Sequence, residues 1–362
     1  MSLSSMENTL KQLCNLLALS GYEDSVINYI TQICSQKNVE YEVDPLGNVI
    51  VQLNKKKDAK RLVVFAHMDE LGLVVTKVED DGFLKVERLG GIPEKSLAGT
   101  EIVIQTETGT YQGVIGTKSH HVTPQDEKLK VKTVNEIYID LGFSSKSEVL
   151  EAGIHAGTPV GYSRRFFTNG TRVFSNTLDN RAGCLTLLEL MNRIDTDKLE
   201  IELYIVFSVQ EEFNLRGVLP AIRKINPDFG ITIDISIASD TPDLKGRDDI
   251  QIGNGPCIGY YTFHGRGTLG GVIPNPKYVK FIEEVAKTSQ ISLQRYASMG
   301  ILTDASFSQL ENNGFPIIDL GFPTRYSHAP IESIDLADID SLVNLLVAIS
   351  ESLNQDCHFT RG

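Results

Sequence analysis

The sequence lacks the features that mark several classes of protein. No apolar run approaches the ~20 residues that a membrane-spanning helix needs. The N-terminus lacks the basic, apolar and small-residue layout of a secretory signal. We find neither an internal repeat nor a low-complexity segment in the 362 residues. We therefore expect a globular cytoplasmic protein that does not bind membranes.

Cysteine and positive charge are also scarce. The five cysteines are scattered, odd in number and never spaced as Cys-x-x-Cys. This pattern excludes a disulfide framework and a zinc ribbon, and it favours reduced thiols in the cytoplasm. Lys and Arg number 34 against 47 Asp and Glu, so the formal net charge is -13. Because nucleic acid and anionic membranes repel such a chain, we expect neither as a partner.

The chain contains two kinds of sequence pattern. Residues 1–70 and 165–362 alternate helix-like and strand-like segments, with short Val/Ile/Phe-rich runs that suit central strands of an α/β sheet covered on both faces. Residues 71–164 hold short β-branched segments separated by turn signals such as Asp81-Gly82. We predict an α/β/α sandwich with a mixed central sheet from 1–70 and 165–362. The insert 71–164 should form a small β-barrel.

Acidic and histidine residues cluster in five short fragments, three of which close an apolar run. The fragments are His67-Met68-Asp69 after Leu62–Ala66, Glu211-Glu212 after Tyr204–Phe207, Asp234 after Gly230–Ile233, and Asp179-Asn180 and Ser327-His328 elsewhere. Ligands of α/β sheets gather at the carboxyl ends of the strands. Imidazoles and carboxylates would be costly to bury there without a counter-cation. A metal site explains them most economically, and the number of ligands indicates two ions.

Each fragment alone also has an ordinary explanation. His67-x-Asp69 could lie at a solvated strand end, and Glu211-Glu212 could start a surface helix. Asp179 could cap the apolar helix that follows it, and a lone His328 in a loop carries little information. Asp234 is harder to dismiss, because burial within its apolar run would demand a partner. These ordinary explanations would all have to hold at the strand ends of one sheet, which favours the metal site.

Charge balance indicates how two ions would be held. Three carboxylates and a bridging hydroxide carry a charge of -4, which balances the +4 of two divalent ions. One ion would take His67, Asp179 and Asp234, and the other Asp179, Glu212 and His328, each with open coordination. Mixed imidazole and carboxylate ligands without thiolate fit zinc, cobalt or manganese, of which zinc is our first expectation.

Two acidic residues remain for other roles. Residues i and i+2 of a strand face the same side, so Asp69 can accept from one nitrogen of His67 while the other nitrogen binds metal. Adjacent glutamates point in different directions, so one can bind an ion while the other acts as general base towards a water of lowered pKa.

The ordered fragments resemble a known family. They are Ala66-His67-Met68-Asp69-Glu70-Leu71-Gly72, Leu178-Asp179-Asn180-Arg181-Ala182-Gly183, Val209-Gln210-Glu211-Glu212, Thr232-Ile233-Asp234 and Arg325-Tyr326-Ser327-His328-Ala329-Pro330, with Leu89-Gly90-Gly91 in the insert. In this order they resemble the glutamyl and deblocking aminopeptidases of the tetrahedral (TET) metallopeptidase family, some of which carry cellulase names. Asn180 departs from the second Asp that many relatives carry, and Gly300–Ala305 replaces a more glycine-rich loop.

The resemblance implies a dimetal aminopeptidase with the same ligands as those assigned above. It also implies that Glu211 is the base, that Asp69 orients His67, and that the insert helps subunits assemble into a hollow homo-oligomer such as a dodecamer. We therefore predict a cytoplasmic enzyme that removes N-terminal residues from peptides. In this hypothesis a metal-bridging hydroxide attacks the peptide carbonyl, and Glu211 carries the proton to the leaving amine.

Alternative functions remain open. A relative of the same fold could cut amino-acid N-acyl bonds or C-terminal residues, although the insert between His67 and Asp179 argues against it. A non-catalytic binding or assembly protein is disfavoured by Glu211 beside five ligands. A glycosidase would need two opposed carboxylates and no metal pair. Near the site, Phe263–Gly267 and Leu269–Gly271 could shape a substrate pocket. Arg325 could contact an acidic substrate, although a structural salt bridge is favoured.

Overall fold

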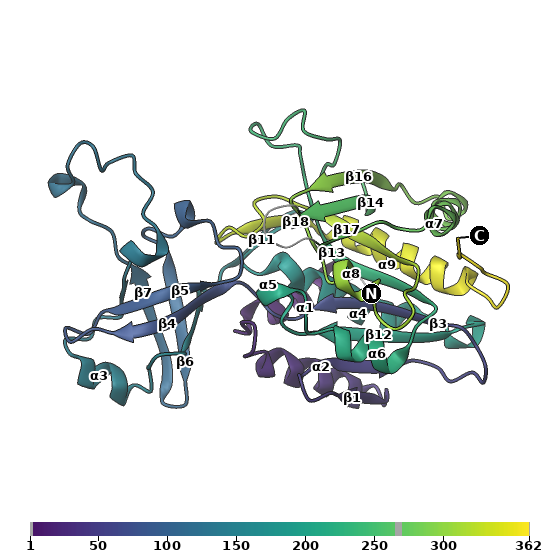
Figure 1. Ribbon diagram of the computed structural model, residues 1–362, viewed down its shortest axis with the longest axis horizontal. Coiled ribbons are helices and arrows are strands. Elements are labelled where there is room, and N and C mark those ends of the chain that lie inside the picture. The colour runs from purple at the N-terminus through teal and green to yellow at the C-terminus, as the bar shows by residue number, and fades with distance from the viewer. Residues whose placement is uncertain (1–2, 265–269, 362) are drawn as a thin grey trace.

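The structure is a computed structural model that describes residues 3–264 and 270–361. Gly265, Arg266, Gly267 and Leu269 of the expected pocket loops lie outside the described residues. Figure 1 shows two parts side by side along the long axis, an α/β part and a β-barrel. The predicted α/β fold with an inserted barrel is confirmed.

The described residues of the α/β part contain one nine-stranded mixed sheet. In sheet order its strands are β1 (Tyr41–Val43), β2 (Val49–Gln52), β12 (Glu202–Ser208), β3 (Arg61–His67), β13 (Phe229–Ile237), β17 (Ile317–Thr324), β14 (Cys257–His264) and β15 (Gly270–Val272), with β16 (Gln294–Met299) paired to β14. The central strands β12, β3, β13 and β17 are mutually parallel. They are buried along nearly their whole length, which explains why they appear in the sequence as continuous apolar runs.

Helices cover both faces of this sheet (Figure 1). One face carries α1 (Leu3–Asn15), α2 (Asp24–Gln36), α4 (Leu178–Arg193), α7 (Pro276–Thr288) and α9 (Leu336–Ser352), and the other carries α6 (Leu219–Ile225) and α8 (Ala305–Ser308). Helix α1 illustrates the pattern, since it buries Met6, Leu10, Leu13 and Cys14 at helical spacing. A short helix, α5 (Glu211–Asn214), follows β12. Among the helices of the described chain, none is long and apolar enough to cross a membrane.

The barrel is closed by antiparallel pairing throughout. Its strands, in order around the barrel, are β4 (Gly72–Val78), β5 (Leu84–Leu89), β8 (Ile139–Asp140), β7 (Gly109–Ile115), β6 (Glu101–Thr106) and β9 (Pro159–Tyr162). A short helix, α3 (Lys146–Glu151), is capped by Ser145, whose hydroxyl accepts from the amide of Glu148. The barrel encloses its own apolar core, separate from that of the α/β part.

Smaller elements complete the fold. A three-stranded sheet is formed by β10 (Phe166–Asn169), β11 (Arg172–Ser175) and β18 (Glu332–Asp335). Single 3-10 turns are η1 (Glu94–Ser96), η2 (His120–Val122), η3 (Val134–Glu136) and η4 (Thr196–Lys198).

A buried ion pair links the two segments that connect the α/β part with the barrel. Glu70 follows β3 on the way into the barrel, and Arg164 follows β9 on the way out. Arg164 donates to both oxygens of Glu70 at 2.6 and 2.7 Å, and the buried Arg181 of α4 donates to it at 3.2 Å. These hydrogen bonds hold both connecting segments next to the residues that the sequence predicts as metal ligands.

The prediction that Asp234 closes the apolar run Gly230–Ile233 is wrong. Strand β13 continues to Ile237 because it pairs with β17 through Ile237 and Thr324. Asp234 is thus a buried carboxylate inside a strand.

Candidate metal centre

Neighbouring strands bring the predicted residues together. Ser208 at the end of β12 is paired with His67 at the end of β3, so the Glu211-Glu212 turn that follows β12 lies beside His67. Strand β13 lies on the other side of β3 and carries Asp234. Asp179 stands just before the regular part of α4, which is capped by Asn180, whose Oδ1 accepts from the amide of Gly183 at 3.0 Å, so Asp179 is not the N-cap.

Three groups of ligand atoms converge within the described residues. The groups are His67 with Asp179 and Asp234, Asp179 with Glu212 and His328, and His67 with Glu211 and Glu212. Within each group the ligand atoms lie within 4.8 Å of one another. The first two groups are the same as the two ion sites predicted from the sequence.

Asp179 lies between the two imidazoles. Its Oδ1 is 3.2 Å from Nε2 of His67, and its Oδ2 is 3.6 Å from Nε2 of His328. Nε2 of His328 is also 4.0 Å from Oε2 of Glu212. The two carboxylate oxygens of Asp179 thus face two different imidazoles.

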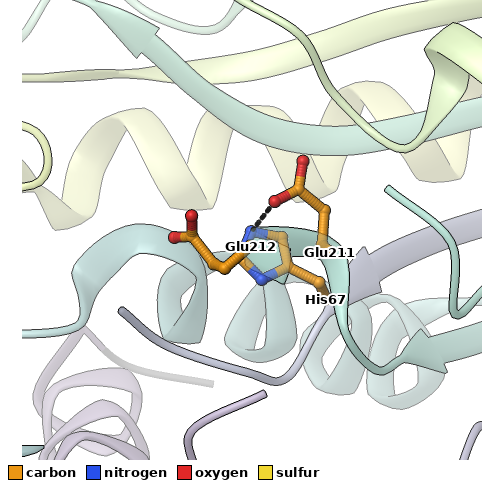
Figure 2. Close-up of side chains that lie close together, drawn as sticks. All are labelled: His67, Glu211 and Glu212. Atoms are coloured by element: carbon orange, nitrogen blue, oxygen red, sulfur yellow. Dashed lines mark ion pairs between the residues drawn. The ribbon is translucent and has the colours of Figure 1, made fainter. Parts of the chain in front are cut away.

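The two adjacent glutamates point to different sides of His67 (Figure 2). Oε2 of Glu211 lies 3.8 Å from Nε2 of His67, while Glu212 extends towards Asp179 and His328. The different directions expected of adjacent side chains at this turn are present.

Burial makes the cluster electrostatically unfavourable by itself. Burial first, and then repulsion from neighbouring carboxylates, raises the pKa of Glu211, Glu212 and Asp234 well above their ordinary values, while His67 opposes the rise. Burial lowers the pKa of His67, but the carboxylates of Glu211 and Asp179 raise it overall. A divalent cation among these groups would relieve both the desolvation and the repulsion.

The donor set fits such cations. Oδ1 of Asp179 and Oε1 of Glu212 are buried and make no hydrogen bond with any described residue. Both residues also contribute a ligand atom to the groups described above. Imidazole and carboxylate together suit zinc, cobalt or manganese.

Asp69 contacts His67 and accepts hydrogen bonds from the main chain of both glutamates. Nδ1 of His67 lies 3.1 Å from the main-chain oxygen of Asp69 and 3.4 Å from its Oδ1, so both near groups are acceptors and Nδ1 carries the hydrogen. The Asp69 carboxylate also accepts from the amides of Glu211 at 3.0 Å and Glu212 at 3.1 Å. Burial raises the pKa of Asp69, but the bonds from His67 and Ser20 lower it overall. Nε2 of His67 is therefore left free to face the site.

Asn180 and Glu332 make hydrogen bonds to the main chain around the cluster. Asn180 donates its side-chain amide to the carbonyl of Ile233 at 2.8 Å, which an ionised aspartate could not do. Glu332, which the sequence analysis missed, accepts from the amides of Asp179 and His328 at 2.9 Å each. Burial, followed by the charge of Asp179, raises the pKa of Glu332 to about 8.

A cavity of about 690 Å³ opens in front of the cluster. Besides the carboxylates, its lining includes the apolar residues Ile235, Ile237, Leu244, Ile301 and Leu302. No Lys or Arg belongs to the lining within the described part of the chain. Arg325 instead pairs with Asp240 at 2.7 Å through two nitrogens, so the favoured structural salt bridge is confirmed.

The comparisons with known proteins agree with one another. The family described as M42 glutamyl aminopeptidase matches residues 47–345. SgcX of Escherichia coli (strain K12), a provisionally named aminopeptidase, is 38% identical over 350 residues, 96% of this chain and 93% of its own. The lysyl aminopeptidase of Pyrococcus furiosus is 32% identical over 349 residues, 95% of this chain and 96% of its own. The TET1 peptidase of Pyrococcus horikoshii, which can assemble into a tetrahedron or a large octahedral shell, has a TM-score of 0.85 at 29% identity, covering 96% of this chain and 100% of that chain.

Proposed function

Since this chain belongs to the M42 glutamyl aminopeptidase family, we propose that its buried cluster holds two divalent metal ions and hydrolyses the N-terminal peptide bond of peptides. Membership confirms the resemblance inferred from the sequence and makes the chain an aminopeptidase. The observation that carries the metal proposal is the convergence of three ligand groups on one buried site.

In this assignment Asp179 would be a ligand shared by the two ions. His67, Asp179 and Asp234 would hold the first ion, and Asp179, Glu212 and His328 the second. When bound, two such ions acidify a water molecule and polarise a carbonyl oxygen. Zinc is the first candidate, followed by cobalt and manganese.

Glu211 is the proposed general base. Its carboxylate lies beside His67, and it is the one member of the glutamate pair that the two-ion assignment does not use as a ligand. A carboxyl with a raised pKa is suited to take a proton from the attacking water and to give it to the leaving amine. Asp69 would fix the position of this base through the amide of Glu211.

The peptide would enter through the cavity in front of the cluster. We also propose a cytoplasmic homo-oligomer, such as a dodecamer, in which the barrel contributes subunit contacts. The tetrahedral or octahedral assembly of the P. horikoshii TET1 peptidase supports the oligomer. The five free thiols, with no disulfide among the described residues, support the location.

The test is hydrolysis of a panel of aminoacyl-p-nitroanilides by metal-stripped protein, with zinc, cobalt or manganese added back. Metal-dependent release would support the proposal and would identify the preferred residue and the best activating metal. Release from N-acetyl amino acids but not from free-amine substrates would instead indicate the deacylase alternative. No turnover of either substrate class with two ions bound would favour a binding or assembly protein.

A further inference from the structure

Among the proposed ligands, His328 lies outside any helix or strand and has a partly exposed side chain. It lies in an irregular segment between β17 and β18, its φ is 67°, and its side chain is 36% exposed. His67, by contrast, lies buried at the end of a central strand. Something other than secondary structure must therefore set the direction of the His328 ring.

The first contact comes from the inserted part of the chain. Nδ1 of His328 lies 3.0 Å from the main-chain oxygen of Gly91, which follows β5 of the barrel. A carbonyl can only accept, so Nδ1 is the donor and Nε2 is left to face Asp179 and Glu212. The insert thus fixes which nitrogen of His328 is available to an ion.

Glycine is required for this approach. A Cβ on Gly91 would lie 3.0 Å from Nδ1 and 3.2 Å from Cε1 of His328, which is tighter than ordinary contact. The preceding Gly90 has a φ of +90°, and a Cβ there would lie 2.2 Å from Cδ2 of Leu71. The Gly90-Gly91 pair therefore brings a carbonyl against the ring where larger residues would push it away.

The second contact comes from β18 in the α/β part. Oε1 of the buried Glu332 accepts from the amide of His328, and Oε2 accepts from the amide of Asp179, both at 2.9 Å. One carboxylate therefore fixes the backbone of two of the three residues that would hold the second ion. Neither contact touches Asp234, which belongs to the first site only.

We propose that Gly91 and Glu332 are positioning residues for the second metal ion, so that a carbonyl of the inserted barrel helps to set its affinity. The inference rests on the proposed two-ion function, because it needs a second ion to be bound. Of the proposed ligands among the described residues, Gly91 contacts His328 and does so at its ring. It should therefore affect the second ion and leave the first unchanged, whereas Glu332 also touches the shared ligand Asp179.

The test is a titration of metal-free protein with Co²⁺, in which visible absorption and calorimetry resolve two binding steps. Gly91→Ala keeps the carbonyl but places a Cβ against the His328 ring, which must then shift away; it should weaken one step about tenfold, the low end of the effect of losing an outer hydrogen-bond partner, and should leave the other within about twofold. Glu332→Gln keeps the shape of the side chain but loses one of two acceptor oxygens, so it should also weaken that step. Turnover of Gly91→Ala should recover at saturating Co²⁺, which a general folding defect would not allow.

Lys95→Ala is the matched control, because Lys95 is an exposed residue of the same insert. It should bind both ions as the parent does. Parent affinity at both steps in Gly91→Ala and Glu332→Gln would overturn the inference, as would equal weakening of both steps in Gly91→Ala. A parent protein that binds fewer than two ions would instead defeat the proposed function.

A spectroscopic measurement covers the case in which Gly91→Ala does not fold. Proton–nitrogen correlation spectra of the metal-free parent, with His328→Gln used to assign the signal, report which ring nitrogen carries the hydrogen. A hydrogen on Nδ1 is expected. A neutral ring protonated on Nε2 would overturn the proposed role of Gly91.

Discussion

The buried ion pair at the junction of the two parts leads to a specific stability prediction. Glu70 is 1% exposed and binds Arg164 through both carboxylate oxygens, as well as the fully buried Arg181. Glu70→Gln preserves the shape of the side chain and removes its charge. Arg181 then loses its only ion-pair partner within the described residues.

The magnitude follows from which charges remain buried. Removing one partner of a buried pair costs about 3–5 kcal/mol, because the other charge is left without compensation. Arg164 is partly exposed and can turn towards water, but Arg181 cannot. Nε and Nη1 of Arg181 already lack hydrogen-bond partners in the described part of the chain. We therefore expect Glu70→Gln to lower the free energy of unfolding by about 4 kcal/mol.

The neighbouring pair between Arg165 and Glu101 provides the control. Its atoms also approach to 2.6 Å, but the two side chains are 55% and 59% exposed. Exposed pairs contribute about 0–1 kcal/mol, so Glu101→Gln should have little effect. Urea unfolding followed by far-UV circular dichroism, at one protein concentration and one metal content, measures both. A loss of less than about 1 kcal/mol in Glu70→Gln, or equal losses in the two variants, would refute the reasoning.

Three further predictions concern catalysis, specificity and pH. Glu211→Gln should keep both ions in the cobalt titration and lower kcat about 10²- to 10⁴-fold, because it removes the proposed base; near-normal turnover would contradict that role. Leu302→Arg adds a guanidinium to a cavity whose described lining has no Lys or Arg, so the ratio of kcat/KM for glutamyl over leucyl substrates should rise roughly tenfold; an unchanged ratio would mean that Leu302 does not face the substrate side chain. Burial raises the pKa of Asp338 to about 6 from an ordinary 3.8, so the native state holds this proton more tightly than the unfolded state. The stability of the parent relative to Asp338→Asn should be highest below pH ~3.8 and fall by on the order of 2–3 kcal/mol as the pH rises through about 6. Urea unfolding from pH 4 to 7 measures this, and a constant difference would contradict it.

The sequence predicted the layers of the fold because its periodicity differs between them. Continuous apolar runs mark the buried central strands β3, β12 and β13, and short β-branched segments mark the barrel. The end of β13 was not predictable in the same way. Its length is set by pairing with β17, which lies about 80 residues further along the chain, and register with a remote strand is a tertiary property.

The sequence also predicted which acidic residues meet, but not what holds them. His67 and Glu211-Glu212 follow apolar runs, so parallel pairing of the strands brings them to one edge. Gly91 acts through a main-chain carbonyl, and Glu332 accepts main-chain amides. Such contacts are independent of any ligand-like spacing. The only signals available were the adjacent glycines Gly90-Gly91 and an acid in a short apolar segment, Ile331-Glu332-Ser333-Ile334.

The number of buried carboxyl groups distinguishes a metal centre from a simple acid–base pair. General acid–base chemistry needs two titratable groups, whereas here the carboxyls of Asp179, Glu211, Glu212 and Asp234 surround His67, and Asp304 lies buried nearby. Burial, only partly opposed by His67, raises the pKa of Asp304 to about 7. Protons could neutralise this excess only by occupying the lone pairs that face the centre. Divalent cations neutralise it while using those lone pairs as bonds, so the same excess that would destabilise a metal-free fold favours tight binding of metal.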